Sequence, residues 1–189
     1  MADLTGLRIH PLATIAASSG AAALGGVALS PALAVGRYIL RGEAAIGPAG
    51  AVLGLTIPTR PCTTALVGDH AALWLGPDEW LLLLPAMHDT TSLAAALSGI
   101  ACSLVDISHR QAAIILEGPG AADTLNAAVP LDLSATAFPV GMCVRTIFEK
   151  AEIVLWRTGL DRFHVEVWRS FGPYVWELLD LVRTENAAL

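Results

Sequence analysis

Charged residues are scarce in this chain of 189 residues. They make up 15% of it, the net charge is −6, and Lys150 is the only lysine. The basic residues form no run, so the sequence lacks the positive surface that binds nucleic acid or an anionic membrane. We therefore expect neither nucleic acid nor a membrane as a partner.

Cysteine is also scarce. Cys62, Cys102 and Cys143 are widely spaced, form no C-x-x-C motif and have no histidine at metal-ligand spacing. An odd number of isolated cysteines indicates neither a disulfide framework nor a zinc site. We expect three buried, reduced thiols and no metal site in this chain.

Long apolar runs are missing as well. No stretch of roughly 18 apolar residues is free of glycine, serine and proline, so no membrane-spanning helix is predicted. Residues 12–35 superficially resemble a signal peptide with a cleavage site in 31–34, but serine and glycine dilute its apolar region. We therefore favour a cytoplasmic protein over a secreted one.

Hydrophobic residues, by contrast, are abundant, at 54% of the chain. A fraction this high suggests that a partner covers part of the apolar surface, although an alanine-rich composition explains much of it. Ten of the eleven basic residues are arginine. Arginine and tryptophan together fit a buried protein interface, and genomic base composition would produce the same arginine bias.

Two segments have the pattern of a β-hairpin. In residues 150–169 the first strand is apolar throughout, the second alternates between two faces, and residues 158–161 supply the turn. Residues 71–84 repeat this scheme, with Trp74 matching Trp156 and Trp80 matching Phe163. The chain is therefore predicted to contain an internal duplication.

The pattern around the hairpins extends the repeat, because residues 39–42 match 115–118 and Pro58 matches Pro130. Turn residues and hydrophobic periodicity predict further strands at 35–41, 65–68, 103–107, 111–117 and 143–148. They predict helices near 47–55, after 89–92, at 118–130 and from 170. The last helix has an apolar stripe formed by Val175, Leu178, Leu179 and Val182. Its polar face is formed by Glu177, Asp180 and Arg183.

These elements predict an α+β fold of two repeats, at about 36–99 and 103–183, within a single region 35–189. Residues 1–34 contain no aromatic residue and no clear periodicity. We expect them to form a loose arm that contributes little to the core.

The sequence offers few candidates for chemistry. Ser108 and His109 are neighbours in the chain but would point to opposite faces of a strand, and no G-x-S-x-G motif is present. His164 and Glu166 lie two residues apart on one face of a strand, where the carboxylate could tune the histidine or simply satisfy it. We favour the satisfied pair.

Four motifs together resemble the gamma subunit of heterotetrameric sarcosine oxidase over about residues 36–183. They are Trp74-Leu75-Gly76-Pro77-Asp78-Glu79-Trp80-Leu81, Asp106-Ile107-Ser108-His109-Arg110, Phe138-Pro139-Val140-Gly141, and Trp168-Arg169-Ser170-Phe171 followed by Pro173-Tyr174-Val175-Trp176. That family is in turn similar to the folate-binding domain of aminomethyltransferase, the T protein of glycine cleavage. This resemblance implies two interlocked, duplicated β-α-β subdomains, in agreement with the duplication inferred from the hairpins.

The resemblance implies a non-catalytic subunit that supports the alpha subunit chiefly, within a complex that also contains beta and delta subunits. The complex would oxidise sarcosine to glycine and hydrogen peroxide, with formaldehyde or methylenetetrahydrofolate as the other product. FAD, FMN, NAD, tetrahydrofolate and zinc would be held by the other subunits, and no cofactor by this chain alone.

The alternative is a free-standing folate-binding module or an aminomethyltransferase-like protein. In aminomethyltransferase a glutamate that binds the pterin follows a Gly-Phe pair, whereas His164 follows Phe163 in this sequence. The catalytic aspartate of that family would fall at or beside Asp69, which could equally be a turn residue. Asp69, His164 and Glu166 are thus the candidates for folate contact, and we expect no catalytic residue.

Overall fold

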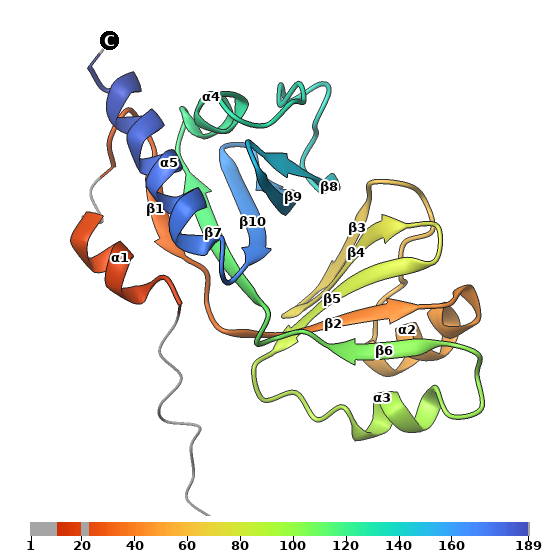
Figure 1. Ribbon diagram of the computed structural model, residues 1–189. Helices are drawn as coiled ribbons and strands as arrows, with labels where there is room; N and C mark the ends of the chain where they lie inside the picture. Colours follow the sequence, from red (N-terminus) through yellow and green to blue (C-terminus); the bar gives the residue numbers. More distant parts are fainter. Residues whose placement is uncertain (1–10, 20–22, 189) are drawn as a thin grey trace, which may run out of the picture.

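A computed structural model describes residues 11–19 and 23–188 as two antiparallel β-sheets with helices packed against them (Figure 1). The helices, in chain order, are α1 (Ala13–Ser19), the 3-10 helix η2 (Glu43–Ala45), α2 (Ile46–Leu53), α3 (Thr91–Ala96), α4 (Ala121–Asn126) and α5 (Gly172–Asn186). The strands are β1 (Ala28–Pro31), β2 (Val35–Arg41), β3 (Thr64–Val67), β4 (His70–Gly76), β5 (Glu79–Pro85), β6 (Ser103–Asp106), β7 (Gln111–Glu117), β8 (Cys143–Phe148), β9 (Ala151–Gly159) and β10 (Arg162–Trp168). This mixture confirms the predicted α+β class.

The two sheets have the same topology. The first has the strand order β3-β4-β5-β2-β6 and the second the order β8-β9-β10-β7-β1, with five strands in each. All neighbouring strands are antiparallel. In each repeat a strand is followed by a helix, a three-stranded meander and a second helix, so the arrangement agrees with the predicted duplication.

One edge strand of each sheet comes from the other repeat. β6, which begins the second repeat, pairs with β2 of the first, and β1, which precedes the first repeat, pairs with β7 of the second. Ser103 lies opposite Arg41, and Ala28 lies opposite Glu117, the residue that matches Arg41 in the sequence. The repeats are therefore interlocked by the mutual exchange of one strand.

This exchange corrects the prediction that residues 1–34 form a loose arm with little contribution to the core. In the described part of that segment, β1 completes the second sheet, and Leu12, Val27 and Leu29 are buried in its main apolar cluster. A strand of four residues is too short to display a clear alternation, so the pattern did not reveal it. Residues 1–10 and 20–22 lie outside the described residues.

Two matching glycines allow the exchanged strands to approach. Gly42 follows β2 with a φ of +105°, and Gly118 follows β7 with a φ of +130°, both in the region that side chains disfavour. A Cβ on Gly42 would lie 2.9 Å from the carbonyl oxygen of Ala101, and one on Gly118 only 2.0 Å from that of Gly26. In both repeats the segment that leads into the exchanged strand therefore requires a glycine.

The predicted match between Trp74 and Trp156 is wrong by one residue. Trp74 lies opposite Trp80, whereas Arg157 lies opposite Phe163, the counterpart of Trp80. Both hairpins have a register shift next to the turn, which the sequence comparison did not reveal. Because neighbours in a strand alternate, Trp156 faces the opposite side of its sheet from Arg157, the true counterpart of Trp74.

Equivalent residues of the two repeats touch each other. Thr63, just before β3, and Met142, just before β8, form an isolated antiparallel bridge. The carbonyl of Thr63 accepts from the backbone N–H of Trp74 at 3.1 Å, and the carbonyl of Met142 accepts from that of Arg157 at 3.0 Å. Such a contact between like positions is expected where an approximate two-fold axis relates two repeats.

Each sheet has an outer and an inner face. α2 and α3 pack on the outer face of the first sheet, α4 and α5 on that of the second, and α1 lies beside α5 (Figure 1). The inner faces pack against one another through a third apolar cluster that includes Leu73, Leu81, Val154 and Trp156. The functional candidates on β10 point into this inner layer.

The final helix differs from prediction at one position. Val175 and Leu179 are buried as the apolar stripe predicts, but Arg183, assigned to the polar face, is fully buried too. Arg183 donates Nη1 to the carbonyl of Val27 at 3.1 Å and pairs with Asp180 at 2.6 Å. The segment before β1 covers this side of α5 and supplies the acceptor. Among the described helices none is long and apolar enough to cross a membrane.

Candidate functional site

Polar side chains interrupt the apolar layer between the sheets. Arg37 comes from β2 of the first sheet, and His164 and Glu166 come from β10 of the second. All three are buried, with exposed fractions of 4%, 8% and 1%. We refer to these three residues as the inter-sheet cluster. It lies here because the alternation that sends Phe163 and Val165 outward sends His164 and Glu166 inward.

Both carboxylate oxygens of Glu166 have a partner. Oε2 accepts from Nε of Arg37 at 2.6 Å, and Oε1 lies 2.8 Å from Nε2 of His164. An ionised carboxylate only accepts, so Nε2 of His164 carries the shared proton. Arg37 also donates Nη1 to the carbonyl of Val35 at 3.2 Å. The bond between Arg37 and Glu166 joins β2 to β10, and thus the first repeat to the second.

The charge state of Glu166 follows from its neighbours. Burial raises the pKa of Glu166, but the hydrogen bond from His164 and the positive charge of Arg37 outweigh this effect and lower it. Glu166 is therefore ionised at neutral pH, with both oxygens occupied. To accept a proton or a ligand, it would have to give up one of these bonds. The inter-sheet cluster is better suited to holding the sheets together than to acid–base catalysis.

The sequence interpretation captured part of this cluster. His164 and Glu166 share a face and satisfy each other, as predicted, but Arg37 was missed. The position of Arg37 in its strand could have identified it. Arg37 alternates with Gly36 and Tyr38 and so shares the inner face of the sheet with Ile39. A charged side chain on a buried face needs a partner. The partner lies 129 positions away, and nothing local identifies it.

Two buried donors in this layer have no protein partner within the described residues. They are Nη2 of Arg37 and Nε1 of Trp156. The ring of Trp156 lies against His164, with 5.8 Å between the ring centroids. These N–H groups are available to a small polar molecule. They differ in kind from the pterin-binding carboxylate of the aminomethyltransferase resemblance, which accepts hydrogen bonds instead of donating them.

Asp69 does not belong to this cluster. It is exposed in the turn between β3 and β4, where it follows Gly68, whose φ is +56°. Aspartate after a glycine with positive φ is an ordinary turn residue. The structure thus brings two of the three sequence candidates together and places Asp69 elsewhere.

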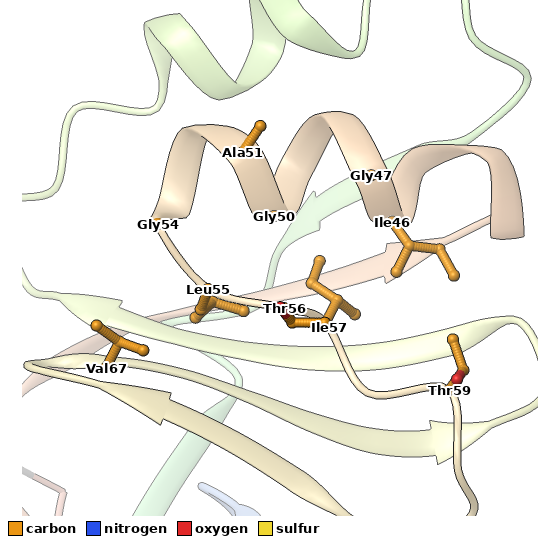
Figure 2. A pocket seen from close by; sticks show the side chains of 10 residues that line it. All are labelled: Ile46, Gly47, Gly50, Ala51, Gly54, Leu55, Thr56, Ile57, Thr59 and Val67. Carbon is orange, nitrogen blue, oxygen red and sulfur yellow. The ribbon is translucent and has the colours of Figure 1, made fainter.

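A groove in the first repeat is mostly apolar. It has a volume of about 680 Å³ and lies between α2 and residues 55–59, with β3 at its margin. In Figure 2 the segment Leu55, Thr56 and Ile57 runs alongside the small residues of α2, and Val67 lies at the end of β3. Its lining contains no ionisable residue, and the threonines Thr56 and Thr59 are its polar side chains. The groove therefore has no ionisable group for acid–base chemistry or to activate a threonine hydroxyl. Nor does the described part of the chain bring three or more His, Cys, Asp or Glu residues together to hold a metal.

Comparison with known sequences identifies a family. The model of the sarcosine oxidase gamma subunit family matches residues 41–185. A protein named sarcosine oxidase subunit gamma from Corynebacterium sp. (strain U-96) is 33% identical, over 100% of this chain and 96% of the relative. One of the same name from Arthrobacter sp. is 32% identical, over 86% of this chain and 83% of the relative.

Comparison with solved structures agrees. A chain of the heterotetrameric sarcosine oxidase from Corynebacterium sp. U-96, solved in complex with pyrrole 2-carboxylate, superposes with a TM-score of 0.88 at 28% identity, covering 97% of this chain and 98% of that one. The aminomethyltransferase T of the glycine cleavage system from Bartonella henselae gives a TM-score of 0.70 at 14% identity, over 89% of this chain and 56% of that one, and shows the shared fold alone. On these matches, this chain belongs to the sarcosine oxidase gamma subunit family.

Proposed function

We propose that this chain is the non-catalytic gamma subunit of a heterotetrameric sarcosine oxidase, where it supports the alpha subunit. The observation that carries the proposal is the end-to-end match, in sequence and in fold, to a chain of a heterotetrameric sarcosine oxidase. In this proposal the complex oxidises sarcosine to glycine and hydrogen peroxide in the cytoplasm. FAD, FMN, NAD, tetrahydrofolate and zinc belong to the other subunits.

The inter-sheet cluster supports a structural role. Its carboxylate is fully engaged by Arg37 and His164, and its three side chains are almost entirely buried. Oxidation of an amine needs a cofactor that accepts a hydride, because protein side chains do not do so. We therefore assign the oxidation to the other subunits.

The surface at the start of α5 supports a role in assembly. Trp168 and Phe171 are each 40% exposed and Tyr174 is 36% exposed, all within seven consecutive residues. The guanidinium of Arg110 stacks on the ring of Trp168 at 5.1 Å from its centroid. Exposed tryptophan, tyrosine and arginine are the residue types that dominate binding energy at protein interfaces. We propose that this surface contacts a neighbouring subunit.

The folate-binding alternative has weaker support. The likeness to aminomethyltransferase shows the fold alone, and His164 stands where that resemblance would need a glutamate. Replacing a carboxylate by histidine would leave the pterin donors without a buried acceptor. Glu166, the carboxylate on the same face, is already paired with His164 and Arg37.

Co-expression tests the proposal. The chain is produced with the alpha, beta and delta subunits from the same organism, and the complex is analysed by size-exclusion chromatography and by peroxide release from sarcosine. We expect an equimolar complex, a loss of assembly or of activity when the chain is omitted, and no peroxide from the chain alone. An active three-subunit complex that excludes the chain would refute the proposal.

Calorimetric titration with tetrahydrofolate tests the alternative. The proposal predicts no saturable binding to the purified chain at micromolar ligand. One-to-one binding that is lost in the His164→Ala variant but kept in Asp69→Ala would place folate in the inter-sheet layer and favour the alternative.

A further inference from the structure

Two cysteines from different repeats lie opposite each other beside the approximate two-fold axis. Thr63 and Met142 form the antiparallel bridge between the repeats, so the next pair outward in the same register is Cys62 and Cys143. The backbone N–H of Cys143 donates to the carbonyl of Cys62 at 3.0 Å, which confirms this register. All three cysteines of the chain, including Cys102, are free thiols in the structure.

This register brings the two residues within the reach of a disulfide. Residues directly opposite in an antiparallel pair have Cα atoms roughly 4.5–5.5 Å apart. A disulfide joins residues whose Cα atoms are roughly 4.4–6.8 Å apart. The hydrogen bond at 3.0 Å between the two residues is therefore compatible with a bond between Cys62 and Cys143.

The backbone at Cys62 is unusual. Its φ is +60°, and among the described residues that have a side chain Glu149 is the other one with a positive φ. This conformation suits glycine or asparagine and is strained for other residues. This strained backbone lies next to the hydrogen bond that pairs Cys62 with Cys143.

The two thiols differ in environment. Cys62 is half-buried and thus reachable from solvent, whereas Cys143 is fully buried. Sγ of Cys143 lies 3.4 Å from the carbonyl oxygens of Thr63 and Trp74. Burial, and the proximity of Cys62, raise the pKa of Cys143 to about 12. Cys62 is therefore the thiol that meets an external oxidant, and Cys143 is the one that follows.

We propose that Cys62 and Cys143 are a redox pair that closes to a disulfide when the chain meets a peroxide. In the first step the thiol of Cys62 gives up its proton, and the thiolate attacks one oxygen of hydrogen peroxide. The O–O bond breaks, Cys62 becomes a sulfenic acid, and the hydroxide that leaves takes up the proton released by Cys62 to form water. In the second step the sulfur of Cys143 attacks the sulfur of Cys62. The S–S bond forms, and the hydroxyl group leaves with the proton of Cys143 as a second water. Two thiols are oxidised and one peroxide is reduced.

The disulfide would tie the two repeats together covalently. Residue 62 lies before β3 of the first repeat and residue 143 begins β8 of the second, so the bond would close a long loop between them. Closing a long loop restricts the unfolded chain and stabilises the fold. The oxidised chain should therefore resist separation of its repeats more than the reduced chain does. This inference does not rest on the proposed function, since the peroxide can be supplied from outside.

Oxidation of the purified full-length chain tests the proposal. The chain is treated with a small excess of hydrogen peroxide, and the remaining thiols are counted with a chromogenic disulfide while the intact mass is measured. We expect two of the three thiols to disappear, with a mass decrease of about 2 Da for the two hydrogens lost. Peptide mapping without reductant should find Cys62 linked to Cys143, and dithiothreitol should restore all thiols.

Cysteine variants supply the controls. Cys62→Ser should prevent the cross-link and leave Cys143 reduced, whereas Cys143→Ala should leave Cys62 as a sulfenic acid that dimedone traps. Cys102→Ser should behave as the wild type, because Cys102 lies elsewhere, with its Sγ 3.9 Å from the carbonyl of Leu97. Three unchanged thiols, a bond to Cys102, or oxidation of Cys62 to a sulfinic acid without a cross-link would each overturn the proposal.

Discussion

Removing one charge from the inter-sheet cluster should destabilise the whole chain. In an Arg37→Met variant, Glu166 would stay fully buried while its ion pair at 2.6 Å is lost. Breaking a buried ion pair by removing one partner costs about 3–5 kcal/mol, because the remaining charge is left uncompensated. A domain of this size loses about 2–4 °C of melting temperature per kcal/mol, so we expect a drop of roughly 6–20 °C.

A second variant and a double mutant separate the ion pair from simple loss of packing. Glu166→Gln should also destabilise the chain, and the double variant Arg37→Met/Glu166→Gln should lose less than the sum of the two single losses. We expect a coupling energy of about 1–3 kcal/mol from urea or thermal unfolding followed by circular dichroism. Additive losses would mean that the two side chains contribute independently, and would refute the argument.

Arg41 offers a matched control on the same strand. It pairs with Asp78 at 3.2 Å and more weakly with Glu79 at 3.8 Å, but its own side chain and that of Asp78 are more than half exposed. Exposed pairs contribute about 0–1 kcal/mol, so Arg41→Met should change the free energy of unfolding by no more than that. A loss at Arg41 as large as that at Arg37 would show that removal of any arginine from β2 is damaging.

The pKa of Glu166 gives the same argument a pH dependence. Because its pKa is lowered in the folded chain, the stabilisation it provides is complete above the pKa of the unfolded chain, roughly 4.3, and is lost as the pH falls through the folded value. Hydrogen bonds from Thr91 and Ser134 lower the pKa of Asp89 and Asp132 as well, so the wild type alone is not informative. The stability of Glu166→Gln should fall less steeply than that of the wild type below about pH 4.5. Parallel pH profiles would contradict this.

Three further variants and one control variant test the interlock and the proposed interface. Gly118→Ala should cost about 3 kcal/mol or more in a thermal melt, because the φ of Gly118 is +130° and a Cβ there would lie 2.0 Å from a carbonyl oxygen. Gly47→Ala is the control. A Cβ at Gly47 would have nothing within 4 Å, so this variant should be neutral or slightly stabilising. Arg183→Leu should remove the hydrogen bond from Arg183 to the carbonyl of Val27, which would keep its bond from the backbone N–H of Leu24, at a cost of about 1.5–3 kcal/mol. Hydrogen exchange should then reveal faster opening of β1, and unchanged exchange would contradict this. Trp168→Ala should leave the melting temperature of the isolated chain nearly unchanged, because the side chain is 40% exposed. It should weaken the affinity for the partner subunits, measured by titration, about tenfold or more. Equal affinities of the variant and the wild type would place the interface elsewhere.

The sequence predicted the elements from residue 35 onward well, because their information is local. The alternation of β10, the turn residues of both hairpins and the proline in the first turn of α5 each specify a structure within a few residues of themselves. The duplication could be recognised for the same reason, since it repeats local patterns. Its exact match at Trp74 failed because a register shift beside a turn changes the pairing without changing the pattern of residue types.

The parts that sequence reasoning missed depend on residues distant in the chain. β1 is recognisable as a strand only through β7, which it joins more than eighty positions later, and Arg183 is a core residue only because the segment before β1 offers it a carbonyl. Both errors had one cause, the assignment of residues 1–34 to a loose arm. Once β1 is placed in the second sheet, the exposed face assigned to α5 is covered and the burial of Arg183 follows.

The inter-sheet cluster shows what a shared fold leaves undecided about function. This chain and aminomethyltransferase T share the fold at 14% identity, and that likeness does not say which side chains line the layer between the sheets. In this chain the layer is closed by apolar residues and by a carboxylate whose two oxygens are used within the protein. A layer that binds a pterin must offer an acceptor that is free until the ligand arrives. Nη2 of Arg37 and Nε1 of Trp156, which lie buried and unpaired in this layer within the described residues, can only donate. Glu166 uses both of its acceptor oxygens for Arg37 and His164, and its bond to Arg37 joins the two repeats.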